Sequence, residues 1–219
     1  MVKTLTIDFV SDVSCPWCVI GLYSLEQALS GMTDQVTADI RFQPFELNPK
    51  MPPEGQDIVE HLTQKYGSNL AQLTAAQKVL SERGAAAGFR FQWQSRQRIY
   101  NTFDAHRLLH WAGLPATETP GLQRVLKKAL FEAYFVRGEN PSSHETLLRL
   151  VAATGLDASR ARAILESDEY ASEVRRVEAY YVDAGIHSVP AVIIDSQHLV
   201  SGGQPAEVFR QALTQALSG

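Results

Sequence analysis

The chain has only two cysteines, Cys15 and Cys18, and two residues separate them. They follow residues 4–10, an apolar stretch rich in β-branched side chains that predicts a buried strand. Pro16 suits the first turn of a helix, where its missing N–H costs nothing, and the helical pattern continues to about Ser30. The sequence therefore predicts both thiols at the junction of a strand and a helix.

Three uses of such a cysteine pair are open: a structural disulfide, half of a zinc site and a redox pair. The loop that this disulfide would close is so short that it removes little entropy from the unfolded chain, which makes a structural use weak. A closed zinc site needs four ligands, and the chain has no second cysteine pair. The pattern favours redox chemistry, in which one thiol attacks and its neighbour resolves.

The remaining pattern places a long helical block between two β-rich ends. Residues 36–43 alternate in polarity and predict a second strand, which completes a strand–helix–strand unit. Residues 191–195 and 198–201 predict a hairpin, and an apolar stripe over 208–217 predicts a last helix. Between the ends, helices are predicted over 56–66, 74–87, 101–112, 118–136, 142–154, 158–166 and 168–184.

Composition excludes several classes of function. Hydrophobic residues make up 45% of the chain and the net charge is −4, as in a globular protein without the basic surface that binds nucleic acid. No segment approaches the ~20 apolar residues of a membrane span. The first residues lack the apolar core and cleavage site of a secretory signal, so we expect a cytoplasmic protein.

Several motifs taken together resemble one known family. They are SCPWC at 14–18, FELNP at 45–49, NTFDAHRL at 101–108, VP at 189–190 and SGGQP at 201–205. This set resembles the DsbA family of thiol–disulfide oxidoreductases, and more closely its FrnE-like branch. The same superfamily contains kappa-class glutathione transferases and 2-hydroxychromene-2-carboxylate isomerases. Those proteins typically carry serine where Cys15 stands, whereas this chain keeps both cysteines.

The resemblance implies an α/β architecture, namely a thioredoxin-like fold with a large all-helical domain inserted in the middle of the chain. We expect residues 1–45 and 170–219 to form the discontinuous thioredoxin-like domain and residues 46–169 the helical insert. The resemblance also implies a cis peptide bond between Val189 and Pro190, beside the thiols.

The same resemblance assigns roles to the site residues. Cys15 would be the nucleophile, since a thiolate at a helix N-terminus faces unpaired N–H groups and the positive end of the dipole. Cys18 would resolve the mixed disulfide, and Pro190 would complete the catalytic set. The backbone of Val189 is expected to pair with an extended substrate segment. The expected substrate-binding residues are Pro16, Trp17, Val189, Asn101 and His106.

Some assignments stay open on the sequence alone. Trp17 fits an exposed platform for substrate as well as a ring packed on the helical insert. Asn101 fits a helix N-cap, and His106 fits an ordinary helix position, as well as a groove. Asp8 and Asp12 compete for the handling of protons. We expect Asp12 to be solvated in the loop beside the thiols. Asp8 stands in the apolar strand, where a carboxylate is costly unless it is used or paired, and alternation does not say which of the two points inward.

Four aromatic residues also have two interpretations. Phe89, Phe91 and Trp93 alternate along the chain, which predicts an extended segment with one aromatic face. With Phe45 they could form an apolar groove for peptide. Aromatic residues at such spacing are more often part of a core.

The resulting hypothesis is a thiol–disulfide oxidoreductase that acts on proteins or small molecules carrying thiols or disulfides, disulfide isomerisation included. It needs no cofactor besides its own Cys15–Cys18 disulfide, with glutathione as a candidate co-substrate. A second hypothesis is a glutathione-dependent isomerase or transferase acting on a small aromatic or polyketide-like molecule. A third is a non-catalytic peptide-binding module.

Overall fold

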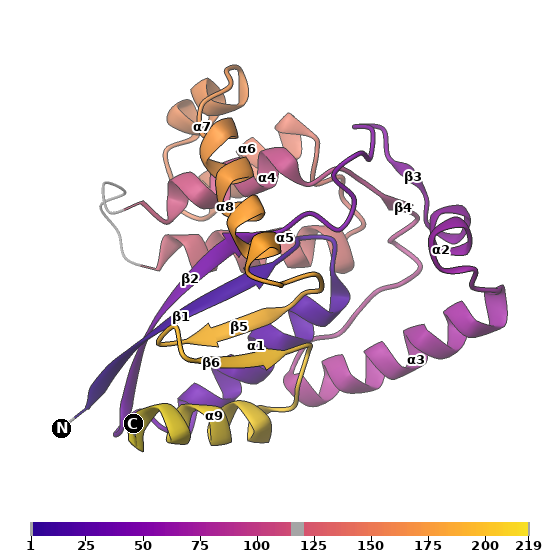
Figure 1. The fold of residues 1–219 in the computed structure, drawn as a ribbon. Helices are drawn as coiled ribbons and strands as arrows, with labels where there is room; N and C mark the ends of the chain where they lie inside the picture. The colour runs from indigo at the N-terminus through magenta and orange to yellow at the C-terminus, as the bar shows by residue number, and fades with distance from the viewer. Residues whose placement is uncertain (1, 115–120, 219) are drawn as a thin grey trace.

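The computed structural model describes residues 2–114 and 121–218. Its centre is a four-stranded sheet made of β1 (Lys3–Ser11), β2 (Val36–Pro44), β5 (Ala191–Ile194) and β6 (His198–Ser201). The strand order is β2-β1-β5-β6, so the two ends of the chain meet in one sheet (Figure 1). β1 runs parallel to β2 and antiparallel to β5, which forms a hairpin with β6. The expected α/β arrangement is confirmed.

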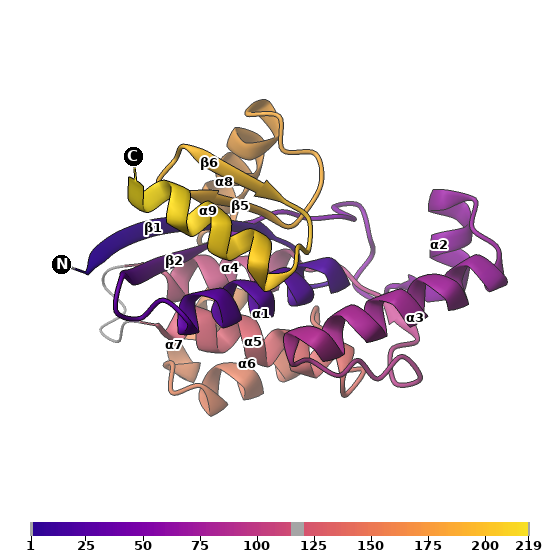
Figure 2. The same cartoon turned by 90° about the horizontal axis from the view of Figure 1, so that it is seen from below.

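Helices α1 (Pro16–Ser30) and α9 (Ala206–Ser218) pack against each other, and α9 also packs on β5 and β6 (Figure 2). Leu22 and Leu25 of α1 are fully buried, as are Phe209 and Leu213 of α9. They join the side chains of β1 in the larger hydrophobic core. This layer holds the start of α1, and with it both cysteines, in a fixed position at the end of β1.

The middle of the chain forms two groups of helices. Helices α4 to α7 share a second hydrophobic core, which also takes in Val13 from the loop after β1. Helices α2 and α3 extend to the opposite side of the molecule, where α3 packs against α1 (Figure 1). The elements are β3 (Gln56–Asp57), α2 (Ile58–Tyr66), α3 (Leu70–Ala87), β4 (Arg98–Ile99), α4 (Phe103–Ala112), α5 (Leu122–Phe135), α6 (His144–Ala153), α7 (Ala158–Leu165) and α8 (Ala171–Asp183).

The predicted helices are present, with boundaries that local capping groups move by a few residues. α3 begins at Leu70 rather than at residue 74, because Asn69 and Gln72 form a capping box. Residues 56–57 were expected in a helix, but they pair with β4 as a two-stranded sheet. Positions 118–120 of the predicted 118–136 helix lie outside the described residues.

The aromatic segment at 89–93 pairs with no strand: residues 89–92 have no regular secondary structure, and Trp93 begins a turn. Its three rings nevertheless pack in succession. The centroids of Phe89 and Phe91 are 4.9 Å apart, and Phe91 stacks on Trp93 at 4.6 Å. Phe89 and Phe91 are buried in the larger core, with Phe91 also in contact with Phe135 of α5. These two rings are therefore core and not groove.

Asp12 joins the thiol loop to the helical part of the chain, and the expectation that it is solvated is wrong. Its carboxylate is fully buried. It accepts hydrogen bonds from the backbone N–H of Ser14 (3.1 Å), the hydroxyl of Ser14 (2.9 Å), the N–H of Leu47 (2.7 Å) and the hydroxyl of Thr102 (2.9 Å). His106 Nε2 lies 3.6 Å from it. Donors from three separate segments converge on this one side chain.

The Asp12 carboxylate stays charged because these partners outweigh its burial. Burial alone raises its pKa, whereas the facing ring of His106 and the hydrogen bonds from the N–H groups of Leu47 and Ser14 lower the pKa to about 2. Asp8 is the other candidate for proton handling. It is half-buried and accepts a hydrogen bond from Gln43 Nε2 at 2.6 Å.

We predict that Asp12 makes the fold sensitive to acid. Its pKa is lower in the folded protein than the ordinary 3.8, so its stabilising effect is present above that value and is lost as the pH falls toward about 2. The loss amounts to about 2 kcal/mol of unfolding free energy. Urea unfolding of the wild type and of Asp12→Asn between about pH 5 and about pH 2 measures it.

In that comparison the Asn variant should be less stable at neutral pH by about 3 kcal/mol, because the buried donors around this position would face a neutral amide in place of a negative charge. Its own decline in acid should be shallower than that of the wild type. Parallel acid declines in the two proteins would contradict a charged Asp12 in the folded state.

Candidate active site

Cys15 is the N-cap residue of α1 and directly precedes Pro16. No side-chain cap bonds to the first turn of this helix. Pro16 carries no N–H, and Cys18 and Val19 donate theirs to the Cys15 carbonyl oxygen (3.1 and 3.4 Å). The Trp17 N–H and the positive end of the helix dipole therefore face Cys15. Cys15 Sγ lies 3.5 Å from the carbonyl oxygen of Val189, which belongs to a distant part of the sequence.

Cys18 lies one turn further into α1 and is fully buried. Burial raises the pKa of the Cys18 thiol well above its usual range. The hydrogen bond and charge of Cys15 raise it further, and the charge of Lys127 opposes them. Both cysteines are free thiols. The geometry suits Cys15 for attack on a substrate and Cys18 for a second step that takes place behind it.

The Val189–Pro190 peptide bond is cis. Pro190 packs on α1 at Gly21, where a Cβ atom would lie only 2.9 Å from Pro190 Cγ. Glycine at this position allows the close approach of the loop to the helix. The result places the backbone of Val189 against the Cys15 thiol.

Trp17 rests on the turn that leads into α9. A Cβ atom at Gly203 would lie 2.8 Å from the Trp17 carbonyl oxygen and 3.0 Å from its ring, so glycine is needed for this contact. Trp17 keeps 36% of its surface exposed. This position favours an exposed platform over a ring packed on the helical insert.

A cleft of about 760 Å³ opens beside Cys15, between the thiol loop and the helices α2 and α3. Pro16, Trp17 and Val189 contribute to its wall, as do Phe45 and Trp93. The two latter rings are thus part of the expected aromatic groove, unlike Phe89 and Phe91. Apolar side chains of α2 and α3 make up much of the opposite wall, among them Ile58, Leu62, Tyr66, Leu70, Leu73 and Leu80.

The polar groups of the cleft are mainly cationic or neutral. Lys65 lines it and donates to the carbonyl oxygen of Leu47 (2.7 Å) and to Asn48 Oδ1 (2.8 Å). His61 of α2 also lines it, and burial lowers the pKa of this imidazole, with Lys65 and Arg96 adding to the effect. Arg96 donates to the Ser14 carbonyl oxygen at 3.4 Å, behind the thiol loop.

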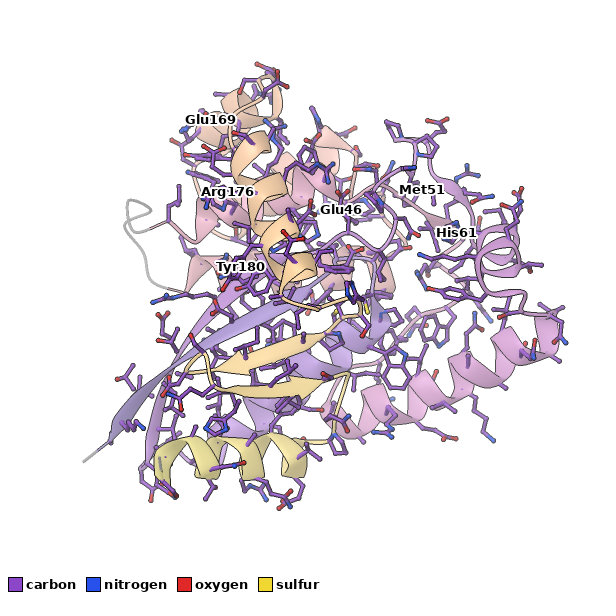
Figure 3. All side chains as sticks on the ribbon, viewed as in Figure 1. Glu46, Met51, His61, Glu169, Arg176 and Tyr180 are labelled. Carbon is purple, nitrogen blue, oxygen red and sulfur yellow. The ribbon has the colours of Figure 1, made fainter. Side chains whose placement is uncertain are left out.

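The acidic residue in the wall is Glu46, which is buried and forms an ion pair with Arg175 of α8. Burial raises the pKa of Glu46, against the effects of His106 and Arg175. Figure 3 shows Glu46 beside α8 and His61 on α2. The guanidinium of Arg175 also lies 3.8 Å from the ring centre of Phe103, which fixes α8 to α4.

Two predicted substrate-binding residues lie outside the wall of the cleft. Asn101 accepts a hydrogen bond from the N–H of Phe103 at 2.8 Å and donates to the Met51 carbonyl oxygen at 3.1 Å, so both ends of its amide are used in the fold. His106 is only 2% exposed and faces Asp12. The structure corrects their expected place in a groove, since their side chains are engaged in packing and in the Asp12 network.

Sequence reasoning missed the α2–α3 wall and Lys127. Tyr66 and Leu70 are apolar residues that stay exposed in the structure, and this exposure marks the wall of a cleft. A sequence does not show which of its apolar residues are exposed. Lys127 stands beside Lys128 in α5, where the pair is typical of a solvated helix face. In the structure Lys127 is fully buried.

Within residues 2–114 and 121–218, no three His, Cys, Asp or Glu side chains are grouped so as to hold a metal ion. Over the same residues, no helix has the length and apolar character needed to cross a membrane.

Comparison with known proteins agrees with this geometry. A probable DsbA oxidoreductase from Streptomyces coelicolor is similar in structure, with a TM-score of 0.88 and 34% identity over 98% of this chain and 90% of that chain. The cytosolic disulfide reductase DsbM from Pseudomonas aeruginosa with GSH shares the fold, with a TM-score of 0.64 and 17% identity over 98% of this chain and 100% of that chain.

Sequence comparison extends over the same length. The uncharacterized protein YwbO of Bacillus subtilis is 24% identical over 212 residues, which cover 96% of each chain. The sequence profile of the DSBA-like thioredoxin domain matches residues 6–214. The chain belongs to the family of DSBA-like thioredoxin domain proteins.

Proposed function

We propose that the protein is a thiol–disulfide oxidoreductase that works through its Cys15-Pro16-Trp17-Cys18 motif. The observation that carries this proposal is the position of Cys15. It occupies the uncapped N-terminus of α1, lines the cleft and touches the backbone of Val189, while Cys18 is buried behind it. Cys15 is itself only 3% exposed, and that small surface lies in the wall of the cleft. A thiol pair that served only to stabilise the fold would not need one member in such a wall.

The exchange proceeds in two steps. The Cys15 thiolate attacks one sulfur of a substrate disulfide, a mixed disulfide forms, and the other substrate sulfur leaves as a thiolate. Cys18 then attacks the Cys15 sulfur, the Cys15–Cys18 bond closes, and the second substrate thiolate leaves. Run in reverse, the same steps oxidise a substrate dithiol, and the reduction potential of the pair decides the direction.

The lining and the volume of the cleft indicate the class of substrate that fits it. Its apolar wall and its volume suit a short peptide segment or a small molecule that carries a thiol or a disulfide. Trp17 and Pro16 would contact the groups next to the reacting sulfur, and the Val189 backbone would pair with an extended segment. No cofactor is required, since the electrons are carried by the two cysteines themselves.

A second candidate is a reaction that depends on glutathione. Lys65 and Arg96 in the wall of the cleft favour an anionic thiol such as this tripeptide. The similar fold of a disulfide reductase with GSH supports the same idea. In this candidate glutathione occupies the cleft as a co-substrate, and the chemistry at Cys18 is dispensable.

We predict that Cys18→Ser accumulates mixed disulfides through Cys15, because the attack still takes place and the resolving thiol is gone. Mass spectrometry after incubation with oxidised glutathione should show one adduct per chain. Cys15→Ser is the control and should show little adduct, since Cys18 is buried. Normal turnover by Cys18→Ser with glutathione would favour the second candidate. An absence of any adduct would favour a non-catalytic module.

We also predict that Lys65 selects anionic disulfides. Lys65→Met should lower kcat/KM for oxidised glutathione by about tenfold, the value of one hydrogen bond to a charged group. With the neutral bis(2-hydroxyethyl) disulfide the change should stay below about twofold, because no charge contact is lost. Lys78→Met is the matched control, since Lys78 is exposed on α3 outside the wall of the cleft. Equal losses for both substrates would assign Lys65 to the fold rather than to recognition.

A further inference from the structure

Lys127 is a buried lysine whose ammonium group has no hydrogen-bond partner within the described residues. Its side chain is fully inaccessible to solvent. Its neighbour Lys128 behaves in the ordinary way, reaching the surface and pairing with Glu26 at 2.6 Å. A buried cation without a partner opposes folding, and native proteins seldom keep one unless it is used. Lys127 therefore needs an explanation that packing does not supply.

The surroundings of Lys127 join it to the thiols. The ionisable groups whose charges act on it are, in decreasing order, Cys18 of α1, Asp12 of the loop after β1, and Cys15. Burial lowers the pKa of Lys127 to about 8, although all three of these groups raise it. On its own helix the ammonium lies 5.1 Å from the ring centre of Phe131. A pKa of about 8 leaves a neutral fraction of the amine near pH 7. Phe131 shares the larger hydrophobic core with Cys15 and Cys18, so the amine lies in the same interior as the thiols.

Asp12 is not free to serve as the partner of Lys127. Its two oxygens already accept four hydrogen bonds from Ser14, Leu47 and Thr102, and His106 of α4 faces it at 3.6 Å. Cys18 has the opposite need. It is fully buried, and among the side chains that act on it Lys127 is the one that favours its thiolate.

We propose that Lys127 is the positioning residue for Cys18: it takes up the proton of the resolving thiol and holds the resulting thiolate against a buried ammonium. This role rests on the proposed exchange function. In the mixed disulfide, the neutral Lys127 amine accepts the proton of Cys18. The Cys18 thiolate attacks Cys15 Sγ, the Cys15–Cys18 bond forms, and the bond from Cys15 to the substrate sulfur breaks. The substrate thiolate leaves with the electron pair and is protonated by solvent.

The reverse direction uses the same proton. When an incoming thiolate attacks Cys15 of the Cys15–Cys18 disulfide, Cys18 leaves as a thiolate and takes the proton back from the Lys127 ammonium. The amine is neutral again once Cys18 holds the proton.

The two steps can be observed separately with 5,5′-dithiobis(2-nitrobenzoate) as the substrate disulfide. One thionitrobenzoate is released when Cys15 attacks, and the second when Cys18 resolves the mixed disulfide. In Lys127→Met, which keeps the length of the side chain and removes the amine, the second phase should slow by at least about tenfold near neutral pH. The pH at which this phase is half-maximal should rise, because Cys18 without the Lys127 ammonium beside it loses its proton only at a higher pH.

Lys128→Met is the matched control, one residue further along α5 and on the surface, and both of its phases should equal those of the wild type. A wild-type rate and pH midpoint for the second phase of Lys127→Met would overturn the proposal. If the wild type itself released no thionitrobenzoate in the first phase, that result would instead refute the exchange function.

A measurement on the unaltered chain guards against a variant that fails to fold. Nuclear magnetic resonance of the Lys127 side chain gives its titration in the reduced protein and in the Cys15–Cys18 disulfide form. The pKa of Lys127 should be higher in the reduced protein, where Cys18 can carry a negative charge beside it. Equal values in the two forms would overturn the role.

Discussion

The buried carboxylate of Asp12 is the contact on which the arrangement of the site depends. It binds the thiol loop through Ser14, the segment after β2 through Leu47, and the start of the helical part through Thr102. A buried charge is tolerated only if donors surround it, so these three segments have to be in place together. Cys15 follows Asp12 by three residues and takes its position from this network. The same network fixes the near wall of the cleft, because Leu47 is part of it.

The two thiols differ because of their surroundings. Cys15 has a helix N-terminus, a backbone carbonyl and a cleft around it, whereas Cys18 has only the interior of the protein and one buried cation near it. The first arrangement favours reaction with a substrate that enters the cleft, and the second favours a thiol that reacts only with its neighbour. Keeping Lys127 in the core opposes stability, since an apolar side chain of the same volume would fit without the loss of hydration. The chain retains a feature that stability alone would remove, as is common at functional sites.

Local patterns were enough to predict the layer that carries the thiols. Periodic apolar residues gave both strands and α1, and Pro16 marked the start of that helix correctly. The start of α3 was placed four residues too late, although Asn69 and Gln72 have the spacing of a capping box. Asp12 and Lys127 could not be placed in this way. A loop has no period that says which side chain turns inward, and the burial of Lys127 results from the packing of α5 against segments distant in the sequence.

The division between chemistry and recognition follows the chain itself. The two thiols and the Val189 backbone come from the sheet layer, while the far wall of the cleft comes from α2 and α3. These two helices reach the sheet layer through the contact of α3 with α1. Changes in that wall alter the shape and charge of the cleft without touching the helix N-terminus that holds Cys15. The buried groups behind the thiols, Asp12 and Lys127, lie outside the wall altogether. A chain built in this way can change its substrate while the thiol chemistry stays the same, because different side chains control the two properties.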